Sequence, residues 1–229
     1  AQGGIDERSF AEHLDWLSAE GVQRVLIAGT TGEFFSLALG ERLDLLKLAL
    51  EYFPGLVWLQ VGGGPLPEAL ALAEQAEGLG ADGVFCLPPA YFARAPQQGV
   101  VDYFQAVGAA VEIPMILYNF SKHTQNPITA EILEAVDHYG MKDSDGNLQL
   151  AGHTPRYFFG SNTSIPSGCR AGAVGFVSAA ANVWPQLYVA LEHAWAQGDA
   201  HEAGTLQSEI DAELRRADRR TLRKPDVRA

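Results

Sequence analysis

Pro114-Met115-Ile116-Leu117-Tyr118-Asn119 is an apolar run that ends in two polar residues, and it lies between two helix-patterned segments. The same alternation of short apolar runs and longer helical segments recurs along most of the chain, which is typical of β-α units around a parallel sheet. The expected strands are residues 25–29, 57–62, 83–88, 114–119, a short one that ends at Lys142, 156–160 and 173–178. The expected helices include residues 10–19, 43–52, 67–79, 99–110 and 129–139. We therefore predict an α/β fold with a parallel sheet.

The regular order of strands and helices favours a closed (β/α)8 TIM barrel over an open sheet, because it shows no topological break. A length of 229 residues with 47% hydrophobic content fits one such domain. A closed barrel of this type needs about eight strands, and the chain begins almost directly with helix 10–19. We therefore expect the first strand to be missing before Ala1.

Composition argues against several classes of protein. A formal net charge of −12 disfavours a nucleic-acid partner, which needs a basic surface to displace counterions. No stretch reaches the roughly 18 apolar residues of a membrane span, and the start of the chain lacks a signal-peptide pattern. Cys86 and Cys169 do not make a disulfide framework, so we expect a cytoplasmic protein. No histidine pair has metal-ligand spacing, so we expect neither a metal nor a cofactor.

Polar residues at three predicted strand ends are the candidates for chemistry, because barrel active sites form where strands end and loops begin. The turn Gly29-Thr30-Thr31-Gly32-Glu33 could hold a carboxylate, and a structural turn with a capping threonine is the equal alternative. Tyr118 lies at the barrel rim, and a core tyrosine bonded to backbone is its alternative. Lys142 is unusual at a strand end because a buried charge is unfavourable there, and pairing with Asp143 is its alternative.

These residue types together indicate amine catalysis. A desolvated lysine can lose its proton, attack a ketone and form an imine that acts as an electron sink. A nearby tyrosine can carry the proton to and from an aldehyde oxygen while a carbon-carbon bond forms or breaks. Paired hydroxyls can hold the carboxylate of a keto acid.

The sequence resembles the dihydrodipicolinate synthase and N-acetylneuraminate lyase family of pyruvate-dependent class I aldolases. Four blocks in the family's order carry the resemblance: Gly29-Thr30-Thr31-Gly32-Glu33, Tyr118-Asn119, Gly140-Met141-Lys142-Asp143-Ser144, and Gly175-Phe176-Val177-Ser178 followed by Ala181-Asn182-Val183. The resemblance implies a barrel over residues 1–182, a packed C-terminal helical region over residues 183–229, and a homo-oligomer, either a dimer or the tetramer usual in the family.

By position, the resemblance makes Lys142 the Schiff-base residue, Tyr118 the proton donor and acceptor, and Thr30 a member of the proton relay. Thr31 would bind the pyruvate carboxylate. The backbone carbonyl of Val177 would face the bound keto acid.

Departures from the family pattern bear on the second substrate. His123 stands where the synthases carry an arginine that binds a carboxylate, and neutral imidazole lacks the bidentate fork of guanidinium. Phe92 stands where the family has a tyrosine that joins a neighbouring subunit's relay, unless Tyr91 is the counterpart. The block Gly160-Ser161-Asn162-Thr163 resembles that of 2-keto-3-deoxygluconate aldolases, with Asn162 as a substrate-binding candidate.

We therefore favour an enzyme that cleaves or forms a 2-keto-3-deoxy sugar acid, with pyruvate and a hydroxyaldehyde as the partner molecules. Dihydrodipicolinate synthase, which joins pyruvate to aspartate semialdehyde, is the first alternative. A non-catalytic relative that binds a 2-oxo acid is the second.

Overall fold

A computed structural model describes residues 4–221 of the chain, and the side chains of residues 4–217. Its strands are β1 (Arg24–Ile27), β2 (Leu56–Gln60), β3 (Gly83–Cys86), β4 (Met115–Asn119), β5 (Gly140–Asp143), β6 (Tyr157–Phe159) and β7 (Ala173–Phe176). Its helices are α1 (Glu7–Ala19), α2 (Leu39–Tyr52), α3 (Leu66–Leu79), α4 (Gln97–Ala109), α5 (Ser121–Thr124), α6 (Ala130–Ala135), α7 (Ile165–Arg170), α8 (Pro185–Ala196) and α9 (Ala200–Thr221), with 3-10 turns η1 (Phe34–Ser36), η2 (Leu148–His153) and η3 (Ala180–Asn182).

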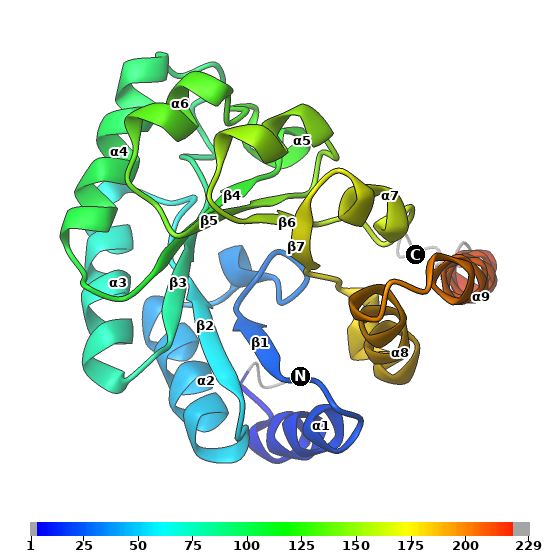
Figure 1. Ribbon diagram of the computed structural model, residues 1–229. Coiled ribbons are helices and arrows are strands. Elements are labelled where there is room, and N and C mark those ends of the chain that lie inside the picture. Colours follow the sequence, from blue (N-terminus) through cyan, green and yellow to red (C-terminus); the bar gives the residue numbers. More distant parts are fainter. Residues whose placement is uncertain (1–3, 222–229) are drawn as a thin grey trace, which may run out of the picture.

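The seven strands form one parallel sheet in chain order, β1 to β7, and the sheet curls round an interior (Figure 1). All seven strands predicted from the sequence are present, and the α/β class with a parallel sheet is confirmed. Within residues 4–221 an eighth strand is not found, and β1 and β7 are the two edges. Helices α2, α3, α4 and α6 lie outside the curl (Figure 1), as expected where right-handed crossovers join parallel strands.

The interior of the barrel is filled by large side chains. Trp58 on β2 packs edge-on against Phe85 on β3, with 5.5 Å between ring centroids. Gly83, at the start of β3, makes room for this indole, because a Cβ there would lie 2.2 Å from the Trp58 ring and 2.6 Å from the Pro114 carbonyl oxygen. The barrel interior around Trp58 and Phe85 is therefore a packed core and not a channel.

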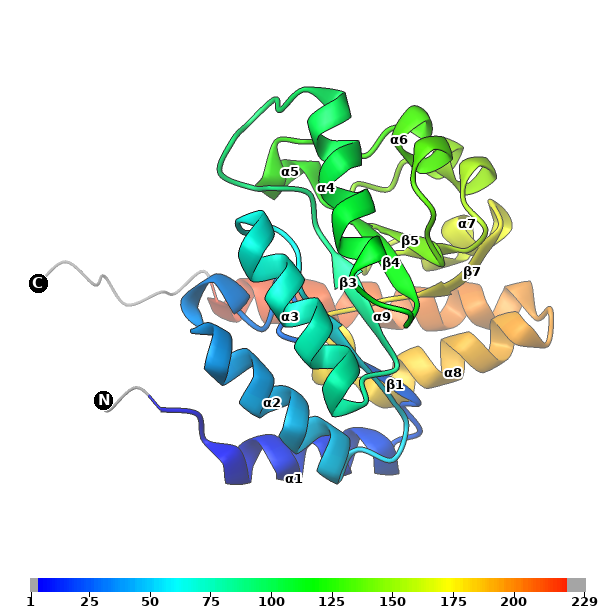
Figure 2. The same cartoon turned by 90° about the vertical axis from the view of Figure 1, so that its left-hand side faces the viewer.

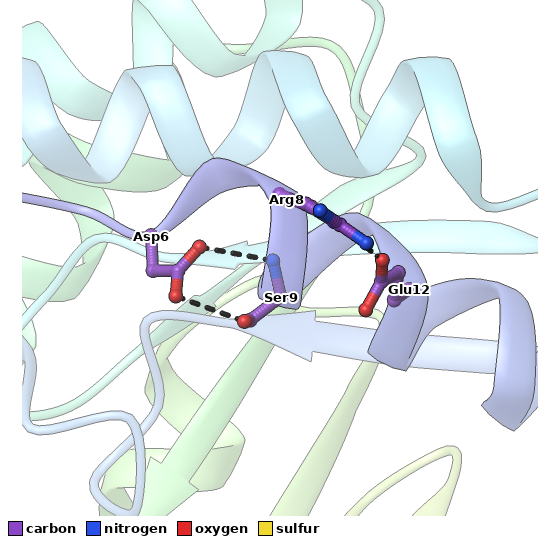
Figure 3. Close-up of polar contacts among 4 residues, drawn as sticks. All are labelled: Asp6, Arg8, Ser9 and Glu12. Carbon is purple, nitrogen blue, oxygen red and sulfur yellow. Dashed lines mark hydrogen bonds and ion pairs between the residues drawn. The ribbon is translucent and has the colours of Figure 1, made fainter.

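Local signals set several helix ends. Asp6 caps α1 through its carboxylate, which accepts hydrogen bonds from the Ser9 amide at 3.1 Å and the Ser9 hydroxyl at 2.8 Å (Figure 3). One turn further on, Arg8 pairs with Glu12 at 2.8 Å on the exposed face (Figure 3), where an ion pair adds little stability.

The predicted helix over residues 129–139 is wrong at its C-terminal end, since α6 ends at Ala135. The chain must reach β5 within a few residues, and the Tyr139 amide already donates to the Met115 carbonyl at 2.8 Å. Sheet pairing therefore overrides the helical periodicity. Thr129 is the N-cap of α6, and its hydroxyl accepts a hydrogen bond from the Ile132 amide at 3.4 Å.

Helices α8 and α9 run side by side beyond β7 (Figures 1 and 2). Helix α9 also packs on α7, so the C-terminal helices contact the last β-α unit. The division into residues 1–182 and 183–229 stays a prediction, and residues 222–229 lie outside the described part. In the described part, no helix is long and apolar enough to cross a membrane.

We expect Gly83→Ala to lower the free energy of unfolding by about 1–3 kcal/mol, because the new methyl group overpacks the Trp58 ring. Gly78→Ala, on the exposed side of α3 with no atom within 4 Å of the new Cβ, is the matched control and should stabilise the helix by roughly 0.5–1 kcal/mol. Urea unfolding of the three proteins measures both changes. Equal stabilities for the two variants would contradict this account of the core.

Candidate active site

Tyr118 and Lys142 lie opposite each other at the ends of β4 and β5, where the strand register pairs them directly. The Lys142 Nζ lies 3.9 Å from the centroid of the Tyr118 ring. Thr30 follows β1, and its Oγ1 shares a hydrogen bond of 3.2 Å with the Tyr118 hydroxyl. Because β1 and β4 are not neighbours in the sheet, this contact crosses the inside of the curl. The fold therefore joins three of the predicted residues in one cluster.

Lys142 is buried, with 7% of its surface exposed. Desolvation of the charged form lowers the pKa of Lys142 below its ordinary value, and the neighbouring Tyr118 opposes this only in part. No carboxylate pairs with the ammonium among the described residues. A larger fraction of neutral amine, the form that attacks a ketone, follows from this environment.

Tyr118 is also buried, and burial alone would raise the pKa of its phenol. The positive charge of Lys142, together with hydrogen bonds from Thr30, Lys142 and Ser144, instead holds the pKa of Tyr118 below its ordinary value. A phenol with this set of partners can give up and regain a proton more readily than a free tyrosine.

Asp143 does not pair with Lys142. The alternative explanation of Lys142 as the partner of an ion pair with Asp143 is therefore wrong. Strand alternation turns the two side chains to opposite faces, and the Asp143 carboxylate is fully buried behind the sheet. It accepts hydrogen bonds from Asn119 Nδ2 at 2.8 Å on β4 and from the Tyr157 hydroxyl at 2.6 Å on β6. The backbone amides of Asp145 and Asn147 donate to it at 3.0 and 2.6 Å.

These bonds tie β4, β5 and β6 together at the strand ends that carry Tyr118 and Lys142. Sequence reasoning missed this role of Asp143. The signal was present, because period-two alternation places residue 143 on the face opposite residue 142.

The turn after β1 bends sharply. Ala28 and Glu33 both have a φ of +51°, a left-handed conformation that is uncommon for residues with side chains. Thr30 is half-buried and faces Tyr118, whereas Thr31 is exposed at the rim. Backbone strain of this kind is often found at ligand-binding turns.

His123 lies exposed on α5, and its ring packs at 84° against Phe120, with 4.3 Å between ring centroids. Phe120 in turn stacks on the Tyr118 ring at 6.2 Å. Phe120 thus lies between His123 and the central cluster, a role that no sequence periodicity indicated.

Asn162 and Val177 follow β6 and β7. The Asn162 Oδ1 accepts a hydrogen bond of 2.7 Å from the Ser178 hydroxyl, and the Val177 amide donates to the Phe159 carbonyl at 2.9 Å. Hydrogen bonds of both residues therefore connect the C-terminal end of β6 to that of β7. The Asn162 side chain is engaged with protein here, which the sequence did not indicate.

Two aromatic side chains stand out from the loop after β3: Tyr91 is 90% exposed and Phe92 is 72% exposed. Buried Asn126 fixes this loop, since its Nδ2 donates to the carbonyls of Pro89 and Phe92 at 2.7 and 2.8 Å. Within the chain, neither aromatic residue belongs to the Lys142 cluster.

A cavity of about 350 Å³ lies away from the cluster, between η1 and the start of α3, with Phe34, Arg42 and Glu68 in its lining. It contains none of Lys142, Tyr118 and Thr30. In the part of the chain that the structure describes, no group of three or more histidine, cysteine or acidic side chains could hold a metal ion.

Comparisons with known proteins show what the chain as a whole is similar to. The model of the Dihydrodipicolinate synthetase family matches residues 1–216. The 4-hydroxy-tetrahydrodipicolinate synthase of Methanopyrus kandleri is 33% identical over 221 residues, which cover 90% of this chain and 73% of that protein. The 2-dehydro-3-deoxy-D-gluconate/2-dehydro-3-deoxy-phosphogluconate aldolase of Thermoproteus tenax is 32% identical over 216 residues, 91% of this chain and 70% of that protein.

The crystal structure of KD(P)GA from T. tenax superposes with a TM-score of 0.85 at 32% identity and covers 92% of this chain and 76% of that chain. The likeness confirms the α/β barrel class for the curled seven-stranded sheet.

We expect Lys142→Met to raise the free energy of unfolding by roughly 0.5–2 kcal/mol at neutral pH, because it replaces a desolvated ammonium with an apolar side chain of similar length. Since the pKa of Lys142 is lowered in the folded chain, the unfolded chain binds more protons at this residue. The native protein therefore gains stability as pH rises towards the ordinary lysine range, and the advantage of the variant shrinks there.

Urea unfolding between about pH 7 and pH 10 tests this. Lys47→Met, at an exposed lysine beside Asp44, is the control and should stay within about 0.5 kcal/mol of the native chain at each pH. If the Lys142→Met protein is less stable than the native one at neutral pH, desolvation of the Lys142 ammonium does not lower the free energy of unfolding as we expect.

Proposed function

The chain belongs to the dihydrodipicolinate synthetase family, a family of carbon-carbon lyases, and from that membership we propose that it works through a Schiff base between Lys142 and pyruvate. The observation that carries the proposal is the buried Lys142 amine against the Tyr118 ring, with the phenol bonded to Thr30. A hydroxyl relay beside a desolvated amine is the arrangement that imine chemistry requires.

In the proposed first half-reaction, the neutral amine of Lys142 attacks the keto carbon of pyruvate. Proton transfer to the keto oxygen releases it as water and leaves a protonated imine. Loss of a proton from the pyruvate methyl group gives an enamine, which is the carbon nucleophile. Thr31 and nearby backbone amides at the turn after β1 would hold the pyruvate carboxylate, and the Val177 carbonyl would face the keto acid.

In the second half-reaction, the enamine carbon attacks the aldehyde carbon while the aldehyde oxygen takes a proton. Tyr118 is the proposed donor, and Thr30 returns a proton to it. Hydrolysis of the resulting imine consumes one water and frees Lys142. Cleavage of the adduct runs the same steps in reverse, with Tyr118 as the base.

For the acceptor we propose a hydroxyaldehyde, so that the adduct is a 2-keto-3-deoxy sugar acid. Support comes from His123, a residue without the guanidinium fork that would bind a second carboxylate. Further support comes from the T. tenax relative, which is named as an aldolase of such an acid. Asn162 would help to shape this end of the site through its loop.

Dihydrodipicolinate synthesis from pyruvate and aspartate semialdehyde is the second candidate, favoured by the name of the M. kandleri relative. It needs a group that binds the semialdehyde carboxylate. His123 offers a single imidazole N–H donor at a time for this in its neutral form, without the fork of a guanidinium. A non-catalytic relative that binds a 2-oxo acid remains the third, and it requires that Lys142 form no imine.

We also propose a homo-oligomer, either a dimer or a tetramer, and a cytoplasmic location. The exposed Tyr91 and Phe92 support the first, because adjacent exposed aromatics commonly mark interfaces. Two buried cysteines, neither in a disulfide, support the second.

Tyr118→Phe separates imine formation from proton transfer. We expect borohydride reduction in the presence of pyruvate to add one adduct to Lys142 in both native and variant chains. Turnover should fall about 10²- to 10⁴-fold in the variant, because a general acid-base group is lost at nearly constant volume. Peptide mass spectrometry locates the adduct, and steady-state kinetics gives kcat.

Tyr103→Phe is the matched control, since that buried hydroxyl donates to the Gly64 carbonyl at 3.1 Å away from the cluster. Its turnover should stay near native. An adduct on Lys47 or Lys122 alone, or none in folded protein, would remove the Schiff-base mechanism and favour the non-catalytic binder.

The acceptor is tested by kcat/KM for glyceraldehyde and for aspartate semialdehyde, each with pyruvate. We expect the native chain to prefer glyceraldehyde. His123→Arg should shift the preference towards the semialdehyde by about ten- to a hundredfold, the worth of one charge-assisted pair.

Lys122→Arg, which keeps the charge at the neighbouring exposed position, should leave the ratio unchanged. If the native protein strongly prefers aspartate semialdehyde, the result favours dihydrodipicolinate synthesis over the proposed sugar-acid aldolase activity.

A further inference from the structure

Helix α9 contacts the segment after β6 through the buried side-chain amide of Gln207. Gln207 is only 8% exposed, and α9 lies beside α7 at the edge of the barrel (Figure 1). Its Nε2 donates to the Asn162 carbonyl at 3.1 Å, and its Oε1 accepts from the Ile165 amide at 2.9 Å. Asp211, one turn further along α9, accepts from the same Nε2 at 2.9 Å and so fixes which way the amide points.

The two bonds from Gln207 bracket a strained residue. Ser164, the N-cap of α7, has a φ of +62°, in the left-handed region that serine rarely adopts. Such a conformation persists only when its surroundings over-determine it. Gln207 supplies that restraint, because its side chain satisfies one backbone group on each side of Ser164.

The other end of the same loop lies against the Lys142 strand. The Gly160 amide donates to the Asp143 carbonyl at 2.7 Å. A Cβ on Gly160 would lie 2.5 Å from the Ser144 Oγ and 2.7 Å from the Asp143 carbonyl oxygen, so only glycine lets the loop start this close. Residues 160–164, which we call the β6 loop, therefore begin beside the proposed Schiff-base strand and end at Gln207.

We call the two hydrogen bonds from Gln207, to the Asn162 carbonyl and from the Ile165 amide, the Gln207 clamp. The polar side chains of the β6 loop lie between this clamp and Gly160. The Asn162 Oδ1 accepts from the Ser178 hydroxyl, whereas the hydroxyls of Ser161 and Thr163 bond to each other at 3.2 Å, and the Thr163 amide donates to Ser161 Oγ at 3.3 Å. That hydroxyl pair can rearrange to donate to, or accept from, the hydroxyls of a bound sugar.

We propose that Gln207 is a positioning residue for acceptor specificity: it holds the β6 loop so that Ser161 and Thr163 present their hydroxyls to a polyhydroxy aldehyde. The proposal rests on the proposed aldolase function, and it adds a contribution of the C-terminal helix to the choice of the second substrate. Gln207 touches no reacting atom in this scheme. Its removal should therefore affect the acceptor half-reaction and spare the pyruvate half-reaction.

The test compares Gln207→Ala and Gln207→Glu with Ser208→Ala, whose exposed hydroxyl donates to the Gly204 carbonyl within α9 at 2.9 Å. Glutamate keeps an acceptor for the Ile165 amide but has no donor for the Asn162 carbonyl and meets Asp211 as a like charge. We expect KM for glyceraldehyde to rise about tenfold in both Gln207 variants, with kcat within about threefold of native, because a loosened loop loses pre-organised binding. Ser208→Ala should match the native enzyme.

Two further measurements separate this inference from the proposed function. The rate of borohydride trapping with pyruvate should be the same in all four proteins, and hydrogen exchange at the Ile165 amide should accelerate at least tenfold in Gln207→Ala. An unchanged KM for the aldehyde, or trapping that falls in step with it, would overturn the positioning role. Absence of trapping in the native protein would overturn the proposed function instead, and unchanged exchange at Ile165 would overturn the clamp whether or not the chain is an aldolase.

Discussion

The pairing of β4 with β5 is the constraint on which the rest of the site depends. Parallel register sets Tyr118 opposite Lys142 on the inner face and Asn119 opposite Asp143 on the outer face. A shift of one residue would exchange the two faces and place a carboxylate inside the barrel and the amine outside it. The inner pair carries the proposed chemistry, and the outer pair anchors the strands that hold it.

Asp143 and Lys142 are neighbouring ionisable residues on β5, both are buried, and their surroundings are opposite in kind. Asp143 keeps its charge satisfied by four hydrogen-bond donors from two side chains and two backbone amides. Desolvation by burial lowers the pKa of Lys142, and no carboxylate in the described chain offsets that effect. The supporting Asp143 thus takes four hydrogen bonds, whereas the Lys142 amine contacts Tyr118 and has no ion pair in the described chain.

The residues that we propose for substrate choice are held by parts of the chain that are distant in sequence. The β6 loop is bonded by Ser178 after β7 and by Gln207 on α9, while the ring of Phe120 connects His123 to Tyr118. Relatives named as synthases and as aldolases resemble this chain to a similar degree, 33% and 32%. Differences in such supporting contacts are therefore a better place to look for specificity than the lysine and tyrosine.

The sequence by itself determined the alternation of strands and helices and the position of every strand, and it marked Lys142, Tyr118 and the turn at Thr30-Thr31 as the candidates for chemistry. These follow from local rules, because apolar runs, period-two patterning and polar residues at strand ends act over a few residues. The end of α6, the partner of Asp143 and the clamp from Gln207 were decided only by tertiary structure. Each depends on which segments meet across the sheet or along α9, and a contact between residues 42 positions apart, such as Ile165 with Gln207, leaves no local pattern to read.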